Sequence, residues 1–483
     1  MTLPRDPAHP ASSGRRPGAA DIEELRRSVS GAVIVPDDAR YEEARRVWNG
    51  AIDRRPALIV RCRDAADVVE ALRFARSERL LVAVRGGGHN VAGYGTCDGG
   101  VVIDLSPMRA VRVDPATSTV RVEGGARWGD VDAATQAAAL ATPGGLVSTT
   151  GVGGLTLGGG IGWLSRAYGL TCDNLIAADL VTADGTQVRA DERDRPELLW
   201  ALRGGGGNFG IVTSFELRLH PVGSVLGGAI LYPLEQAAAV LRAYRSVVAE
   251  APDQLATVLN LMTVPAAPEL PSDLHGRRVL AVGVCHSGAP EEGERAVAPL
   301  RRLGTPLLEQ IAVMPYAVRQ RLQDASAPAG LGNFWKAHYV TGLDDELIDL
   351  IVAGAARATS PLSQIHLYHL GGAIARAGSD EGAYGHRSSP FLVSAVAVWD
   401  DLSSDVSPHV EWARWIWAGA RPHADGTYVN FLGEEGRVGV RAAYRPGVYE
   451  RLAAVKARYD PTNVFCLNHN VEPALEPGGG GSS

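Results

Sequence analysis

Apolar and polar residues follow two different rhythms along this chain. Up to about residue 221, short apolar runs bounded by Gly, Pro and Asp are separated by patterns in which apolar residues recur at helical spacing. Asp64, a residue type that caps helices, precedes such a pattern at 65–76. Strands are predicted at 57–62, 81–84, 101–105, 111–113 and 120–122, and a further helix at 128–140.

The second rhythm begins near residue 223 and has longer strands and helices. Its predicted strands are 227–232, 278–285, 364–370 and 391–399, and its predicted helices are 234–250, 292–303, 345–359 and 409–420. The change of rhythm indicates a second domain of α+β type. One more helix is predicted at 448–459, where Asp460-Pro461 ends it.

The composition fits a soluble globular protein, with 46% hydrophobic and 21% charged residues among 483. The formal net charge of -7 and the lack of a basic tract argue against nucleic acid as a partner. We find no run apolar enough to span a membrane and no signal-peptide pattern, so we expect no membrane partner and a cytoplasmic location. The five scattered cysteines fit a reducing compartment.

The run Arg85–Asn90 is the most informative motif, because it contains three consecutive glycines directly after the strand at 81–84. Without Cβ atoms, the backbone N–H groups of such a turn approach an anion closely. His89 then projects from this bare loop. Holding the pyrophosphate of a cofactor requires such a loop, and the histidine places a nucleophilic ring beside the rest of the cofactor.

Two more glycine-rich blocks follow. Residues 144–162 interleave glycines with apolar residues, which argues against a flexible linker. The third block matches G-x-G-x-x-G at Gly205, Gly207 and Gly210. A Rossmann motif needs a strand before it and a helix after it, whereas here a helical pattern precedes the block and a strand-like run at 211–217 follows. We therefore reject the Rossmann interpretation.

Together with Tyr168–Leu170, Asp173-Asn174 and Asn463–Phe465, these blocks resemble the berberine-bridge-enzyme-like branch of the vanillyl-alcohol-oxidase flavoprotein superfamily. The resemblance covers residues 37 to 473 and is strongest to bacterial members that act on secondary metabolites. It implies a PCMH-type FAD-binding domain of two subdomains, interrupted by an α+β substrate domain with an antiparallel sheet covered by helices. We expect a disordered lead 1–35, the FAD-binding domain 36–222, the substrate domain 223–426, a C-terminal return 427–475 and a flexible tail 476–483.

By this resemblance, His89 matches the histidine that bonds covalently to the 8α carbon of the flavin. Such a bond prevents loss of the cofactor and raises its reduction potential. The expected cofactor-binding residues are Arg85, Gly86, Gly87, Gly88, His89, Asn90, Val147, Thr149, Thr150, Gly151, Gly154, Gly158, Gly159, Ile161, Gly210, Ile211, Val212, Asn468 and Asn470.

The chain departs from the family pattern at several positions. Many relatives carry a cysteine where this chain has Val147 and form a second flavin bond with it, so we expect one covalent bond here. Leu155 replaces a histidine near the flavin N1 edge. Phe431 replaces a tyrosine that deprotonates the substrate in several members, and His469 replaces an amide in the closing segment.

The catalytic candidates are consequently Tyr428, His366 and Thr150. Tyr428 belongs to the motif that Phe431 ends, and a packing role is equally supported. Thr150 matches the family position beside the oxygen-reactive carbon of the flavin.

His366 lies on the strand at 364–370, where alternation places it on one face with Tyr368, and His369 on the other face. A shared metal site is therefore disfavoured. His366 is the leading candidate for the general base, because a histidine suits proton removal near neutral pH, with a structural histidine as the alternative. Lys336 fits either an active-site cation or a solvated lysine.

We expect an FAD-dependent oxidase with FAD attached covalently through His89. Its partners would be a small organic or natural-product substrate and O₂. The alternatives are flavin-dependent oxygenation of a polyketide-like substrate, a dehydrogenase with another electron acceptor, and a catalytically silent flavin- or ligand-binding protein.

Overall fold

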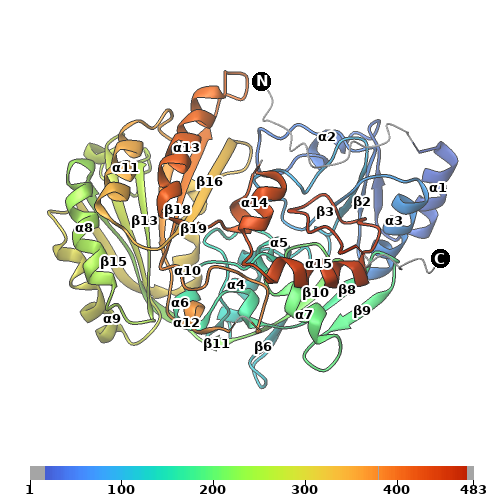
Figure 1. Ribbon diagram of the computed structural model, residues 1–483, viewed down its shortest axis with the longest axis horizontal. Coiled ribbons are helices and arrows are strands. Elements are labelled where there is room, and N and C mark those ends of the chain that lie inside the picture. The colour runs from blue at the N-terminus through green and yellow to red at the C-terminus, as the bar shows by residue number, and fades with distance from the viewer. Residues whose placement is uncertain (1–16, 379, 434, 476–483) are drawn as a thin grey trace, which may run out of the picture.

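A computed structural model of the chain describes residues 17–378, 380–433 and 435–475. Two lobes lie side by side in Figure 1, with the N-terminal part on the right and the middle of the chain on the left. The red C-terminal segment lies on the side of the N-terminal lobe, so the chain returns to its first part.

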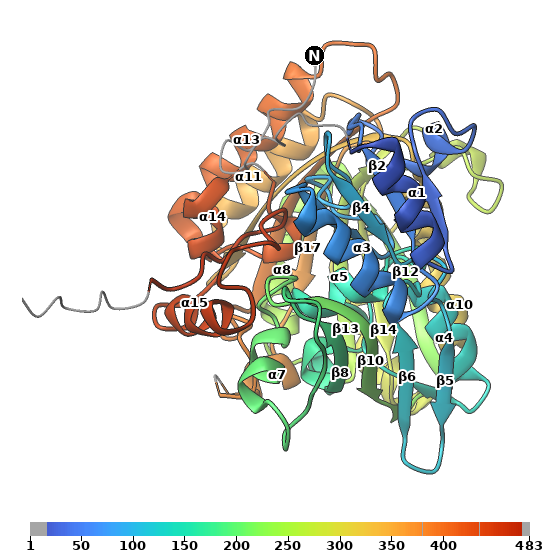
Figure 2. The ribbon, with the colours of Figure 1, turned by 90° about the vertical axis from the view of Figure 1, so that its right-hand side faces the viewer.

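The N-terminal lobe begins with a small sheet. Its elements are α1 (Ala19–Ser28), β1 (Ala32–Ile34), α2 (Tyr41–Ala44), β2 (Leu58–Arg61), α3 (Ala65–Ser77), β3 (Val82–Arg85) and β4 (Val101–Asp104). The strand order is β1-β2-β4-β3, with β2, β4 and β3 parallel and β1 antiparallel. Asp64 caps α3 as predicted, because its side chain accepts a hydrogen bond from the Asp67 N–H. Figure 2 shows α1 and α3 on the outer side of this lobe.

The start of the chain differs from the expected disordered lead at 1–35. Residues 19–34 form α1 and β1, because Leu25, Val29 and Val33 bury their side chains in the core of the small sheet. The predicted disordered segment extends too far, because the residues before α1 are rich in proline, serine and glycine. Residues 1–16 and the expected tail at 476–483 lie outside the described residues.

A second, antiparallel sheet completes the lobe. Its region contains β5 (Val111–Asp114), β6 (Thr119–Glu123), α4 (Trp128–Gln136), β7 (Leu140–Ala141), α5 (Val152–Leu157), α6 (Ser165–Tyr168), β8 (Leu175–Val181), β9 (Gln187–Ala190), α7 (Pro196–Leu202), β10 (Ile211–Arg218) and β11 (His220–Pro221). The strand order is β5-β6-β10-β8-β9. Helix α7 precedes the third glycine block and β10 follows it, so the block is flanked in the reverse of the Rossmann order. Helix α4 ends before the predicted residue 140, because Ala139 has a φ of +52° and β7 follows.

The other lobe is built on one long antiparallel sheet with the order β15-β12-β14-β13-β17-β18-β16-β19. Its strands are β12 (Ser224–Pro233), β13 (Leu255–Thr263), β14 (Arg278–His286), β15 (Leu308–Pro315), β16 (Gly332–Val340), β17 (Gln364–His369), β18 (Phe391–Trp399) and β19 (Ala424–Gly426). Its helices are α8 (Ala237–Val248), α9 (Pro290–Val297), α10 (Tyr316–Arg321), α11 (Asp345–Ala356), α12 (Ala373–Arg376) and α13 (Ser407–Ala420). Strands β13, β15 and β16 had no counterpart among the predicted strands.

The two faces of this long sheet have different neighbours. Helices α8, α11 and α13 cover one face and share its apolar core (Figure 1). The opposite face contributes Val258, Tyr368 and Leu392 to a core shared with Ile161 and Trp163 of the N-terminal lobe. Side chains that alternate along β17 therefore point either to the helices or to the other lobe.

The C-terminal segment contains α14 (Gly436–Ala442) and α15 (Val448–Tyr459), the latter at its predicted bounds. Buried Lys456 holds α15 in place: its Nζ donates to the Asp460 carboxylate at 2.6 Å and to the carbonyls of Asn208 and Phe465 at 2.8 and 2.9 Å. Asn208 belongs to the third glycine block, so this lysine fixes the C-terminal return against that loop. No helix in the described part of the chain has the length and apolarity needed to cross a membrane.

Candidate active site

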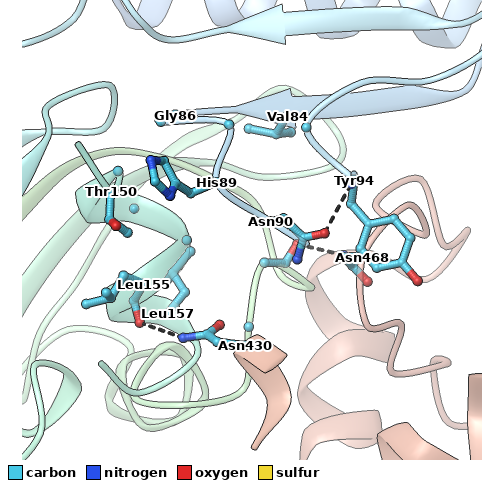
Figure 3. A pocket seen from close by; sticks show the side chains of 18 of the residues that line it. Val84, Gly86, His89, Asn90, Tyr94, Thr150, Leu155, Leu157, Asn430 and Asn468 are labelled. Carbon is cyan, nitrogen blue, oxygen red and sulfur yellow. Dashed lines mark hydrogen bonds between the residues drawn. The ribbon is translucent and has the colours of Figure 1, made fainter. Parts of the chain in front are cut away.

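The three glycine blocks meet around one cavity of about 320 Å³, which we call the main cavity. The loop after β3 lines one side, the segment from Gly145 to Leu157 another, and the third block a further part. The C-terminal residues Asn430 and Asn468 close it, and Figure 3 shows them facing the glycine loops. The Asn430 amide also donates to the Leu155 carbonyl at 3.2 Å, which ties the C-terminal return to the second block.

Two glycines let the first and second blocks touch through their backbones. A Cβ atom on Gly87 would lie 2.3 Å from the Gly151 nitrogen, and one on Gly151 would lie 2.3 Å from the Gly87 nitrogen. Neither position tolerates a side chain without movement of the backbone. The glycine pattern therefore serves the close approach of two loops as well as the approach of a cofactor.

Arg85 supports the first loop from beneath. Its guanidinium donates to the Asp104 carboxylate and to the Ala44 carbonyl, both at 2.7 Å. Burial opposes ionisation of Asp104, but the charge of Arg85 and its hydrogen bond outweigh it and lower the Asp104 pKa. The cation is thus already paired, and its role is to anchor the loop.

His89 stands on the wall of the main cavity. Its Nε2 lies 2.9 Å from the Thr149 hydroxyl, and its ring stacks on Trp48 with centroids 4.9 Å apart. The side chain borders the main cavity and is partly buried by neighbouring residues, and this burial, with a smaller contribution from Arg127, lowers its pKa to about 4. The imidazole is therefore neutral at physiological pH, which is the nucleophilic form.

Most of the expected cofactor-binding residues line the main cavity. They are Arg85, Gly86, Gly87, Gly88, His89, Asn90, Val147, Thr150, Gly151, Gly154, Ile161, Gly210, Ile211, Val212 and Asn468. Four expected residues, Thr149, Gly158, Gly159 and Asn470, lie outside that lining. Added Cβ atoms at Gly158 and Gly159 would meet Asn430 and Tyr384, at 2.0 and 2.6 Å, so these glycines make room for protein neighbours. Thr149 does not border the cavity itself but holds the His89 ring through its hydroxyl group.

The three catalytic candidates do not lie in the same cavity. Tyr428 and Thr150 line the main cavity, whereas His366 does not. The Tyr428 oxygen accepts hydrogen bonds from the Gly160 N–H and the Asn430 amide, both at 2.9 Å, and burial raises its pKa. Lys336 lies on the helix-covered side of the sheet, where it forms a buried ion pair with Glu435 at 2.7 Å. It is therefore neither a solvated lysine nor a cation of this cavity.

His366 lines a second, smaller cavity of about 80 Å³, which we call the annex cavity. The two cavities share four lining residues: Leu146, Val147, Trp335 and Tyr368. His366 and Tyr368 do share a face, as alternation predicted, and the His366 Nδ1 lies 3.1 Å from the Tyr368 hydroxyl. Of these two side chains, Tyr368 borders the main cavity, where His366 was expected to act as the base.

Other lining residues were absent from the sequence-based prediction. Trp48, Trp335 and Asn260 come from three distant segments, and nothing in their immediate sequence marks them. Tyr368 could have been predicted, because strand alternation already placed its side chain on the same face as that of His366. Among the described residues, no group of three or more His, Cys, Asp or Glu side chains could hold a metal ion.

The main cavity fits FAD. Bare glycine loops supply backbone N–H groups for phosphates, and apolar side chains such as Val84, Leu157 and Ile211 supply walls for a flat ring. The buried Asn468 Oδ1 at its edge has no hydrogen-bond partner among the described residues and so offers an acceptor to a bound group.

Comparisons with known proteins agree with this fit. Residues 56–191 match the model of an FAD binding domain, and residues 427–472 match the berberine and berberine-like model. (R)-6-hydroxynicotine oxidase of Paenarthrobacter nicotinovorans is 34% identical over 465 residues, which cover 92% of this chain and 97% of that protein. An FAD-linked oxidoreductase of Dictyostelium discoideum is 32% identical and covers 95% and 99%.

Solved structures confirm the expected fold class. 6-Hydroxy-D-nicotine oxidase from Arthrobacter nicotinovorans superposes with a TM-score of 0.84 at 31% identity, covering 92% of this chain and 99% of that one. A berberine bridge enzyme variant, at 20% identity, shares the fold with a TM-score of 0.81. This chain therefore belongs to the berberine-bridge-enzyme-like family and is an FAD-dependent oxidoreductase.

Proposed function

We propose that this protein is an oxidase whose FAD is held by a single covalent bond to His89. When bound, FAD accepts a hydride from a small organic substrate and passes the electrons to O₂. The observation that carries the proposal is the His89 site, a neutral imidazole oriented by Thr149 and Trp48 on the wall of the main cavity.

The hydrogen bond to Thr149 indicates which nitrogen forms the bond. A nucleophilic nitrogen needs a free lone pair, and a neutral imidazole has only one nitrogen of this kind. The Thr149 hydroxyl lies within hydrogen-bond distance of Nε2, and when it accepts, Nε2 carries the proton and Nδ1 would be the nitrogen that bonds the 8α carbon. That bond would replace a C–H bond of the flavin methyl group; the proton would leave to solvent and the two electrons would pass through the flavin to O₂. Trp48 keeps the plane of the ring fixed during this step.

The side chains around the cavity support a single covalent bond. Val147 lines it where many relatives have a cysteine, and no cysteine of the described residues is part of its lining. Cys172 is fully buried outside the cavity, and burial raises the pKa of its thiol far above the usual value. A buried neutral thiol is unreactive.

The catalytic candidates take distinct roles in this proposal. The Tyr428 hydroxyl oxygen accepts hydrogen bonds from two N–H groups. Its own O–H can therefore donate a hydrogen bond to a substrate oxygen or nitrogen in the cavity. His366 does not line the main cavity, and it reaches that cavity through its hydrogen bond with Tyr368. Thr150 lines the cavity at the position assigned to O₂ access. The similarity to (R)-6-hydroxynicotine oxidase supports a small organic substrate.

Acid precipitation followed by peptide mapping tests the covalent bond. We expect the yellow colour to stay in the pellet on a peptide that contains His89, and His89→Ala to release its flavin into the supernatant. A colourless wild-type pellet, or a His89→Ala variant that stays covalently yellow, would refute the assignment.

Stopped-flow reoxidation tests the electron acceptor. The reduced enzyme is mixed with O₂ in one series and with a quinone dye in the other. Faster reoxidation by O₂ is expected for an oxidase, whereas a sluggish reaction with O₂ and a fast one with the dye would identify a dehydrogenase.

A further inference from the structure

The annex cavity has a lining without charge. Among its described lining residues, Trp48, Trp335, Val258 and Val396 provide apolar surface, and no Asp, Glu, Lys or Arg takes part. The two tryptophan rings meet edge to face, with centroids 5.9 Å apart. Aromatic and branched walls of this kind suit a flat, uncharged ring.

A chain of hydrogen bonds sets the direction of the Tyr368 hydroxyl. The His366 Nε2 lies 3.0 Å from the Gln364 Oε1, an amide oxygen that can only accept, so Nε2 carries the proton. Burial lowers the pKa of His366 to about 4, so the ring is neutral and its Nδ1 has a lone pair. Tyr368 therefore donates its proton to Nδ1, at 3.1 Å, and presents oxygen lone pairs to the cavity.

Two more acceptors of the annex cavity have no hydrogen-bond partner in the described part of the chain. They are the buried Asn260 Oδ1 and Gln323 Oε1. Asn260 is paired with His366 across neighbouring strands, so the two side chains point to the same face of the sheet. An unsatisfied buried acceptor is costly, and a ligand that brings O–H or N–H donors removes the cost.

We propose that the annex cavity selects an uncharged aromatic ring that carries hydroxyl or N–H donors, and that it disfavours the same ring when the donors are methylated. The proposal rests on the function above and names the substrate class for that site. Tyr368, Asn260 and Gln323 offer three acceptors, and His366 is the positioning residue that makes Tyr368 one of them.

Calorimetric titration of the purified holoenzyme with 2-naphthol and with 2-methoxynaphthalene tests the selection, because the two probes differ in one O–H donor. We expect 2-naphthol to bind about tenfold more tightly, as for one hydrogen bond to a buried acceptor. Equal affinities, tighter binding of the ether, or no binding of either probe would overturn the proposal.

Two variants test the acceptors separately. Tyr368→Phe is expected to weaken 2-naphthol about tenfold and to leave the ether unchanged. His366→Leu removes the acceptor of the Tyr368 proton, so the hydroxyl turns into the cavity and becomes a donor. The ether should then bind more tightly than to wild type and 2-naphthol more weakly. A loss of both affinities by the same factor would mean a merely structural histidine and would contradict the proposal.

Tyr244→Phe is the matched control, since it removes another buried hydroxyl of the same lobe, bonded to Thr257 at 2.6 Å, outside both cavities. We expect no change for either probe. A similar loss in this control would attribute the effect to packing and overturn the proposal. Calorimetry detects the probes whether or not the flavin is covalent, so this result is independent of the acid-precipitation test.

Discussion

The main cavity and the annex cavity adjoin each other but are built by different means. The main cavity is shaped by backbone, since glycines of three loops meet there and the closest approach joins Gly87 to Gly151. The annex cavity is shaped by side chains of β13, β16 and β17 and of the segment around Trp48. On the proposed function, the cofactor is recognised by contiguous motifs, whereas the substrate meets residues gathered from distant parts of the chain.

The largest effect is expected at the backbone contact of the main cavity. Gly87→Ala would place a Cβ 2.3 Å from the Gly151 nitrogen, so the two loops must separate. We expect complete loss of bound flavin, measured as the ratio of absorbance at 450 and 280 nm in the purified protein. Gly342→Ala is the control, because a Cβ there meets nothing within 4 Å. A fully yellow Gly87→Ala protein would refute a backbone-shaped cavity.

A second change sharpens the contrast between the two faces of the long sheet. Lys336→Met leaves the Glu435 carboxylate, which is 12% exposed, without its ion-pair partner and should destabilise the protein by about 3 kcal/mol. Because Lys336 faces the helices, we expect flavin binding to persist in the folded fraction. Urea unfolding measures the first effect and flavin absorbance the second. Loss of flavin without loss of stability would instead indicate that Lys336 contributes to the active site.

The hydrogen bond behind His89 gives a smaller effect. Thr149→Val keeps the shape of the side chain but removes the hydroxyl 2.9 Å from His89 Nε2. We expect covalent attachment to become about tenfold slower, which corresponds to one hydrogen bond. Acid precipitation at intervals after FAD is added to the apoprotein follows the rate. Thr156→Val, whose hydroxyl bonds the Val152 carbonyl, serves as control. Equal rates in all three proteins would remove Thr149 from the attachment step.

The smallest effect concerns the contact between the lobes. Burial raises the pKa of Asp132 to about 7, and its carboxyl group accepts a hydrogen bond from the Gln320 amide of the other lobe at 3.2 Å. Because the folded-state pKa lies above the unfolded one, the folded protein binds this proton more tightly. Stability from this group is therefore fully present below the ordinary carboxyl pKa near 4, declines between pH 4 and 7, and is lost above pH 7.

Asp132→Asn should abolish this dependence. Its melting temperature should exceed that of wild type by about 2 to 4 °C at pH 8, and the difference should shrink to zero as the pH falls to 4. Thermal melts at both pH values provide the measurement. An identical pH dependence in the variant would assign the titration to another group.

Local patterns predicted the elements whose stability is local. Asp64 before α3, the helix at 448–459 and the glycine blocks were all visible, because capping, helical spacing and backbone freedom depend on neighbouring residues. The strands β13 and β16 were missed, although they supply Asn260 and Trp335. Their membership of the sheet depends on pairing with strands far along the chain. The position of Lys336 was open for the same reason.

The sequence by itself determined the family, the cofactor and the bare glycine loop that carries His89, because a missing Cβ is a property of single residues. The tertiary structure decided that Tyr368 faces the main cavity and that His366 stands behind it. It also decided which buried acceptors remain unsatisfied. Burial and hydrogen-bond satisfaction arise only when distant segments pack together, so the chemistry of the annex cavity emerges only in the folded chain.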